Sequence, residues 1–289
     1  MGKSTDDEGE RRGSARALAR AMAAARSGHR EARRSERAAR RARMLRGLEQ
    51  SLFGSRMPEA RALVLQAGWS RESLDAACPR CGVTRATFED VRRGCAECRG
   101  RPLGYDGLVR LGRYAPPLSQ WVPAVKTRAW RGMAEVLGEE LGRQVQDAVA
   151  AERVEPPDLV AFIPTHWLRR MLRGIDHGAC LAEAAARVLG TPVAPLLRTS
   201  LAQRQTGSDR SHRAGRSERF RLSALRRDSA AVAGGCVLRI DDVRTTGSTL
   251  REAAAVLKRA GVRRVIAACC AATDPPNRRG AAFGAPQRA

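Results

Sequence analysis

Aromatic residues and lysines are scarce in this chain of 289 residues, and long apolar runs are missing. Aromatics make up 4% of the residues, which argues against a nucleic-acid platform built from stacked rings. No apolar run reaches the roughly 18–20 residues that a membrane-spanning helix requires, and no apolar segment typical of a secretory signal opens the chain. We therefore expect a cytoplasmic protein with reduced thiols, whose eight cysteines are metal ligands or core residues rather than disulfides.

Positive charge dominates the composition. Lysine and arginine number 53 against 30 acidic residues, a formal net charge of +23, and the lysines among them are only Lys3, Lys126 and Lys258. A field this positive favours nucleic acid, an anionic membrane surface or phosphorylated small molecules, without choosing among them. The 43% of hydrophobic residues supply a sizeable core, so the composition argues against a wholly disordered chain.

Composition divides the chain into four parts. Residues 1–73 are rich in arginine and alanine and predict a basic arm that is largely disordered or loosely helical. Residues 74–101 hold four cysteines in a compact block, and residues 102–273 hold most of the periodic apolar segments. Residues 274–289 are rich in Pro, Gly and Arg and predict a disordered tail.

The periodic region predicts an α/β fold. We expect strands at residues 159–163, 192–197, 236–240 and 262–271, helices at 179–189 and 248–259, and two helical pieces within 105–150. Strands that alternate with helices in this rhythm form a parallel sheet covered by helices.

The cysteine block has the spacing of a metal site. Cys78 and Cys81 form one C-x2-C pair, and Cys95 and Cys98 form a second pair thirteen residues later. Two such turns can direct four thiolates at one ion, which is typical of structural zinc. Four cysteine ligands leave no open position for a catalytic water, so we predict a small structural zinc module rather than a zinc enzyme.

A second motif combines acidic residues with a hydroxyl-rich turn. The predicted strand at 236–240 leads into Asp241 and Asp242, and a short loop follows before the predicted helix. That loop and the helix start supply a glycine and four hydroxyls: Thr245, Thr246, Gly247, Ser248 and Thr249. Backbone N–H groups at a helix start favour phosphate, and carboxylates facing the same crevice can accept hydrogen bonds from a sugar diol. The pattern predicts a site for a phosphorylated ribose, the alternative being an ordinary capped turn beside two solvated acids.

This stretch resembles the phosphoribosyl-pyrophosphate signature of type I phosphoribosyltransferases, and together with the cysteine block the chain resembles the ComF family. Three further segments resemble that family: Tyr114 to Leu118 followed by Lys126, Ile163-Pro164 followed by three arginines, and Gln205-Thr206-Gly207. The resemblance covers about residues 75–273. It implies a Rossmann-like phosphoribosyltransferase domain behind an N-terminal zinc ribbon with four cysteine ligands.

The resemblance also implies roles for individual residues. It assigns the 5-phosphate to residues 245–249 and the ribose hydroxyls to Asp241 and Asp242. Arg169, Arg170 and Arg173 become candidates for neutralising a pyrophosphate that carries Mg²⁺, with Lys126 as a further ligand-binding candidate. One departure lies inside the motif, because Arg239 occupies a strand position that is apolar in the family. A buried arginine there must reach a carboxylate or an edge of the sheet.

Three functions are compatible with these features. The first is a phosphoribosyltransferase that uses phosphoribosyl pyrophosphate and an unknown acceptor, in a context of DNA uptake and competence. The second is an accessory protein that binds single-stranded DNA without turnover, favoured by the zinc module and the net charge. The third is a regulatory binder of a phosphoribosyl ligand.

Overall fold

The computed structural model describes residues 59–86, 89–90, 94–127, 130–164, 175–199, 219–223 and 232–278. The chain divides into two units, residues 1–54 and 55–289, and all the described residues belong to the second. Most of the predicted basic arm therefore lies outside the described residues. In the part of the chain that is described, no helix has both the length and the apolar character needed to cross a membrane.

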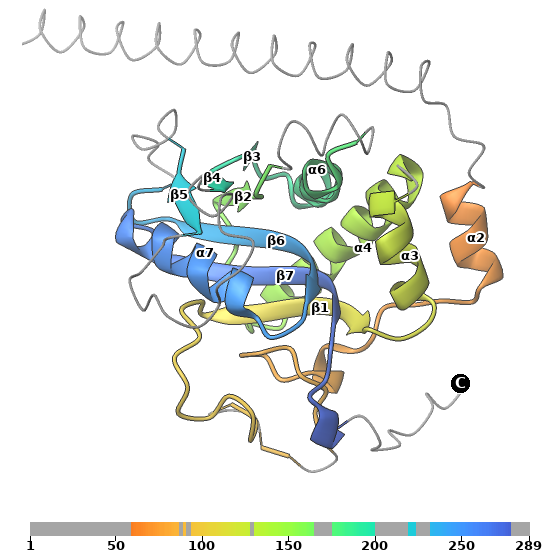
Figure 1. The fold of residues 1–289 in the computed structure, drawn as a ribbon, viewed down its shortest axis with the longest axis horizontal. Helices are drawn as coiled ribbons and strands as arrows, with labels where there is room; N and C mark the ends of the chain where they lie inside the picture. The colour runs from red at the N-terminus through yellow and green to blue at the C-terminus, as the bar shows by residue number, and fades with distance from the viewer. Residues whose placement is uncertain are drawn as a thin grey trace, which may run out of the picture. The chain divides into compact units, whose positions relative to one another are not determined.

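A five-stranded parallel sheet forms the centre of this unit (Figure 1). Its strands, in the order β1-β7-β6-β2-β3, are Gly107–Arg113, Arg264–Ala272, Cys236–Arg244, Leu159–Ala161 and Val193–Ala194. A separate antiparallel pair consists of β4 (Leu197–Thr199) and β5 (Phe220–Leu222). The long strand β6 lies between β7 and β2, so side chains at its carboxyl end sit near the middle of the sheet.

Helices cover both faces of the sheet, as the α/β pattern predicted. One face carries α3 (Leu118–Thr127), α4 (Arg131–Ala150) and α6 (His177–Leu189), whose apolar residues share a core with Leu238 and Ile240 of β6. The other face carries α7 (Ser248–Arg259), which shares a second core with Val237 of β6. Short helical segments complete the described elements: α2 (Ala60–Gln66), η1 (Leu74–Ala76) and η4 (Pro276–Arg278).

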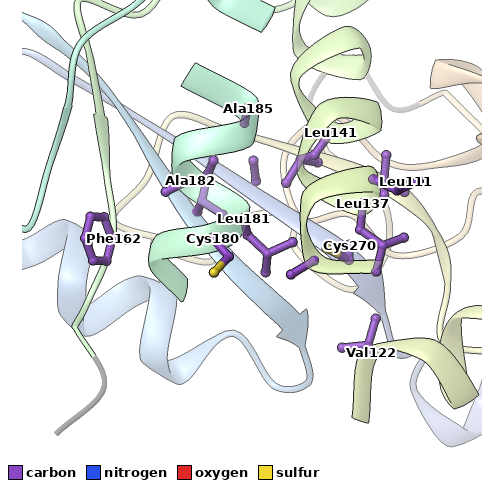
Figure 2. Packing of buried hydrophobic residues seen from close by; sticks show 14 of the residues in the cluster. Leu111, Val122, Leu137, Leu141, Phe162, Cys180, Leu181, Ala182, Ala185 and Cys270 are labelled. Carbon is purple, nitrogen blue, oxygen red and sulfur yellow. The ribbon is translucent and has the colours of Figure 1, made fainter. Parts of the chain in front are cut away.

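Small residues allow α4 and α6 to pack closely. A Cβ at Gly138 would lie 2.5 Å from the carbonyl oxygen of Leu181, and one at Gly142 would lie 2.8 Å from Cβ of Val188. Only glycine fits such a close approach. Figure 2 shows Leu137 and Leu141 of α4 beside the short side chains of α6. The two helices thus form a tight layer on the face opposite α7.

Several predicted elements are confirmed. Helix α7 begins and ends where the apolar spacing placed it, and α6 begins two residues earlier than expected, with the Asp176 side chain accepting a hydrogen bond from the Ala179 N–H. Strands β2, β6 and β7 overlap the expected ranges. The expectation of purely helical structure within residues 105–150 is wrong at its start, because Gly107–Arg113 is the strand β1.

The apolar pattern did not predict strand β1, because a buried arginine interrupts its apolar residues. Arg110 is 4% exposed, and its guanidinium donates to the Gly82 carbonyl at 2.7 Å, the Glu72 carboxylate at 2.8 Å and the Thr84 hydroxyl at 2.9 Å. Asp274 lies 3.9 Å from the same guanidinium. These acceptors come from three distant parts of the sequence, so Arg110 joins the cysteine block and both flanking segments to the sheet.

Segments at both ends of the described region pack against the domain. Trp69 meets Trp121 of α3 edge to face with ring centroids 5.7 Å apart, and Arg71 pairs with Glu140 at 3.1 Å and with Asp147 at 2.8 Å. Residues 59–73, which were predicted to belong to the disordered or loosely helical arm, are therefore folded against the domain. At the other end, residues 274–278 of the predicted tail are ordered, since Arg278 makes two 2.8 Å hydrogen bonds to Glu89, which lower the pKa of that carboxyl to about 2.

Candidate functional site

The hydroxyl-rich turn connects β6 directly to α7. Gly247 adopts a left-handed conformation with φ of 74°, which a residue with a side chain adopts only with strain. The turn aligns the first N–H groups of α7, which have no partner inside the helix. The Thr246 hydroxyl lies 3.2 Å from the Ser248 hydroxyl and accepts a hydrogen bond from the Ser248 N–H at 3.4 Å. Amides and hydroxyls are thus gathered at one helix start, where an anion is favoured.

Three arginines surround this turn, and sequence reasoning missed them. Arg251 donates to the Thr246 carbonyl at 3.1 Å, and Arg219 donates to the Thr249 hydroxyl at 3.3 Å. The Nε atom of Arg244 lies 3.6 Å from the position that a Cβ at Gly247 would take. Arg244 and Arg251 stand beside the motif in the sequence, so their proximity could have been anticipated, whereas Arg219 arrives from the separate strand pair.

Tyr105 is a second unanticipated neighbour of the turn. Its hydroxyl lies 3.6 Å from the position of a Cβ at Gly247, although its side chain is largely buried. Burial raises the pKa of Tyr105 to about 12, with Arg244 and Arg251 acting in the opposite direction. The phenol therefore keeps its proton at neutral pH and can donate a hydrogen bond.

The two acids lie on opposite faces of the sheet. Strand β6 continues through Arg244. Asp241 is in register with Cys269, a residue of the core on the α7 face, whereas Asp242 forms an ion pair with Lys126 of α3 on the other face. This differs from the expectation that both carboxylates face the same crevice, which assumed that the strand ended before them.

Each acid has a cation from this chain beside it. The ammonium group of Lys126, at the end of α3, forms an ion pair with Oδ2 of Asp242. On the other face, Nη2 of Arg239 lies 3.6 Å from Oδ2 of Asp241. Of the two outcomes expected for Arg239, a carboxylate or an edge of the sheet, the structure shows the first. Burial raises the pKa of Asp241 and the Asp242 charge adds to this, while Arg239 lowers it.

The remaining predicted ligand contacts divide between described and undescribed residues. Lys126 is at the site through Asp242, and residues 245–249 form the turn itself. The three arginines predicted to neutralise pyrophosphate, Arg169, Arg170 and Arg173, lie outside the described residues. The pyrophosphate side of the site therefore stays a prediction.

The four predicted metal ligands form one buried cluster. Their Sγ atoms all lie within 4.8 Å of one another, with 3.7 Å between Cys78 and Cys98, 3.5 Å between Cys81 and Cys95, and 3.8 Å between Cys95 and Cys98. A tetrahedral zinc ion with Zn–S bonds of about 2.3 Å requires S–S edges of about 3.8 Å. The donor set and spacing thus fit zinc.

A glycine leaves room for one of the four cysteine sulfurs. A Cβ at Gly94 would lie 2.8 Å from Sγ of Cys98, and Gly94 has a φ of 92°. A side chain there would press on a ligand sulfur. Arg80, inside the first pair, donates to the Cys98 carbonyl at 3.3 Å and so ties the two cysteine turns together.

The chain is similar to several known proteins. A family model described as phosphoribosyl transferase domain matches residues 170–281. The DNA utilization protein YhgH of Salmonella typhimurium is 30% identical over 184 residues, covering 64% of this chain and 78% of that protein. Competence protein F of Haemophilus influenzae is 25% identical over 191 residues, covering 65% and 82% of the two chains. Among solved structures, a glutamine phosphoribosylpyrophosphate amidotransferase from B. subtilis is 22% identical with a TM-score of 0.33, over 47% of this chain and 25% of that one.

Proposed function

Because the chain belongs to the ComF family of competence and DNA-utilization proteins, we propose that it binds phosphoribosyl pyrophosphate or another ribose 5-phosphate ligand at the start of α7. The observation that carries the proposal is the strand–turn–helix of β6, the Thr-Thr-Gly turn and α7. A phosphate at this helix start would receive hydrogen bonds from main-chain amides and from the hydroxyls of residues 245–249. Arg244 and Arg251 would add positive charge beside it.

The acids would hold the sugar. Asp241 and Asp242 stand three and two residues before the end of β6, and their side chains are 20% and 13% exposed, so each is proposed to accept a hydrogen bond from a ribose hydroxyl. Lys126 would keep Asp242 in place while the ligand enters. The ligand would thus be held at its phosphate by amides and at its diol by acids.

With phosphoribosyl pyrophosphate, the proposed reaction is displacement of pyrophosphate at the anomeric carbon by an acceptor. The C–O bond to the leaving group breaks and a bond to the acceptor forms, so the chain has to position the ribose rather than supply a nucleophile. Arg169, Arg170 and Arg173 are proposed to neutralise the departing charge.

Magnesium does not fit as a resident ion of these acids. Carboxylate oxygens are the ligands that Mg²⁺ prefers, but Asp241 and Asp242 each already face a cation of this chain. We therefore propose that any Mg²⁺ arrives on the pyrophosphate of the ligand, and we assign it no protein ligand. Zinc, in contrast, is proposed as the structural ion of the four cysteines.

Thermal shift with graded ligands tests the binding proposal. Phosphoribosyl pyrophosphate with Mg²⁺ and ribose 5-phosphate should each raise the melting temperature in a saturable way, whereas ribose without phosphate should not. Pyrophosphate release with a panel of nucleobases then separates an enzyme from a binder without turnover. Equal responses to ribose and ribose 5-phosphate would contradict the proposal, because the phosphate is the group that the turn is proposed to hold.

Binding of single-stranded DNA is the second candidate. Its support is the group of arginines around the turn, Arg219, Arg244 and Arg251, together with the net charge of +23. The double variant Asp241→Asn with Asp242→Asn separates the two candidates. If the sites are distinct, it should abolish binding of the ribose ligand and leave salt-sensitive DNA binding nearly unchanged.

A further inference from the structure

Arg239 is a buried residue of β6 whose presence the packing of the sheet does not explain. Its side chain is 2% exposed, yet its Nε and Nη1 atoms are buried without a hydrogen-bond partner. In-register neighbours Ala161 and Ala267 leave room for a long side chain on the α7 face of the sheet. Leaving charged donors unfilled in a buried position is costly, so stability does not account for an arginine here.

Arg110 shows what a structural arginine looks like in the same sheet. It is also buried in a strand, but its two terminal nitrogens reach a carbonyl, a hydroxyl and a carboxylate at 2.7–2.9 Å. The only carboxylate paired with Arg239 in the described part of the chain is Asp241, at 3.6 Å and beyond hydrogen-bond distance. What Arg239 supplies is therefore positive charge beneath Asp241.

We propose that Arg239 is a positioning residue for the ligand, which keeps Asp241 in the charged form that accepts hydrogen bonds from the sugar hydroxyls. The side chain of Asp241 is 20% exposed, so a ligand can reach this carboxylate while the guanidinium stays covered. The inference rests on the proposed ribose 5-phosphate function and adds Arg239 to the residues that serve it.

The surroundings of Asp241 explain why it needs this cation. Burial and a neighbouring negative charge both favour the protonated acid, and a protonated acid has lost acceptor capacity. The titratable and charged groups around it are Arg239 and Asp242 on its own strand, Lys126 of α3, and Cys269 and Cys270 of β7. Lys126 is already paired with Asp242 on the other face, which leaves Arg239 as the cation that acts mainly on Asp241.

The test compares wild-type protein with Arg239→Leu and Arg239→Lys. Removing the cation should raise the pKa of Asp241, so the affinity of Arg239→Leu for ribose 5-phosphate should fall about tenfold or more relative to wild type near pH 6, and much less near pH 8. Arg239→Lys should retain most of the affinity at both pH values. Carbon-13 NMR titration of the Asp241 carboxyl in the free proteins should show the same shift without any ligand.

The outcomes distinguish this inference from the function on which it rests. If wild-type protein does not bind ribose 5-phosphate, the proposed function fails and the inference fails with it. If wild type binds but Arg239→Leu has the same pH profile, or if the Asp241 titration is unchanged, the inference alone is overturned. A fall in melting temperature as large as that of Arg110→Leu would also overturn it, since Arg239 would then be structural.

Discussion

Lys126 at the end of α3 and Asp242 near the end of β6 form an ion pair across one face of the sheet. The carboxylate side chain is 13% exposed and the lysine side chain 32% exposed, so the pair is only partly shielded from water. This contact connects α3 to the acidic motif of β6. The ion pair thus places Lys126 at the candidate site, which the sequence indicated only through the family resemblance.

Breaking this pair should destabilise the protein moderately. Lys126→Met leaves the Asp242 carboxylate without its cation, and we expect the free energy of unfolding to fall by about 1–3 kcal/mol. Asp242→Asn removes the same interaction from the other side. A double-mutant cycle should give a coupling energy of about 0.5–3 kcal/mol. Strictly additive single changes would show that the two side chains do not interact.

Replacing Gly247 should lower the affinity for ribose 5-phosphate by more than its effect on unfolding stability explains. Gly247→Ala places a Cβ at a φ of 74°, a strain of about 1–2 kcal/mol, and disturbs the amides proposed to hold phosphate. Gly190→Ala is the matched control, because Gly190 has a φ of 65° at the end of α6, far along the chain from the motif. Both variants should lose similar stability in chemical denaturation, but only Gly247→Ala should lose ribose 5-phosphate affinity. Equal affinities of the two variants would count against the turn as the binding site.

The cysteine cluster should hold about one zinc ion per chain, and removal of any one cysteine should abolish metal binding. Cys95→Ser removes one of four ligands, and we expect loss of bound metal together with a marked fall in melting temperature, because structural zinc supplies on the order of 10 kcal/mol to folding. Elemental analysis of purified protein measures the metal. Cys236→Ser is the control, since Cys236 is equally buried but lies outside the cluster. Full metal content in Cys95→Ser would refute the four-cysteine site.

Arg110 should be the most costly arginine in the sheet to replace. Arg110→Leu leaves the Glu72 carboxylate and the Gly82 carbonyl without their donor, and we expect the free energy of unfolding to fall by about 3–5 kcal/mol. Arg113→Leu on the same strand is the control, because that side chain is 44% exposed and pairs with Glu72 at 3.5 Å, and its loss should stay within about 0.5 kcal/mol. Urea denaturation compares the two variants. Similar falls in the free energy of unfolding for the two variants would show that the contacts of Arg110 contribute no more to stability than those of an exposed arginine.

The motifs could be predicted because their information is local. Regular apolar spacing placed α7, and the C-x2-C spacing brought four thiols together without knowledge of the fold. Strand β1 could not be predicted in this way. Its central residue is Arg110, which is buried and donates hydrogen bonds to Glu72, Gly82 and Thr84. These partners are distant in the sequence, so the residues near Arg110 do not indicate that a buried arginine can be satisfied there.

In the candidate site, too, the features set by consecutive residues could be predicted and those set by distant contacts could not. The amides and hydroxyls of the turn follow from consecutive residues, but the orientation of the two acids depends on where β6 ends. Pairing with β7 continues to Arg244, and this tertiary contact sends the carboxylates to opposite faces. Tyr105 and Arg219 join the turn from segments far away in the sequence, so no local signal identified them.

The most direct test follows the backbone amide resonances of residues 245–249 while ribose 5-phosphate is added to ¹⁵N-labelled protein. We expect saturable shifts centred on Gly247, Ser248 and Thr249, which disappear when ribose replaces its phosphate ester. Saturable binding that leaves these amides unmoved and shifts another region, or no binding at all, would contradict a phosphate site at this turn.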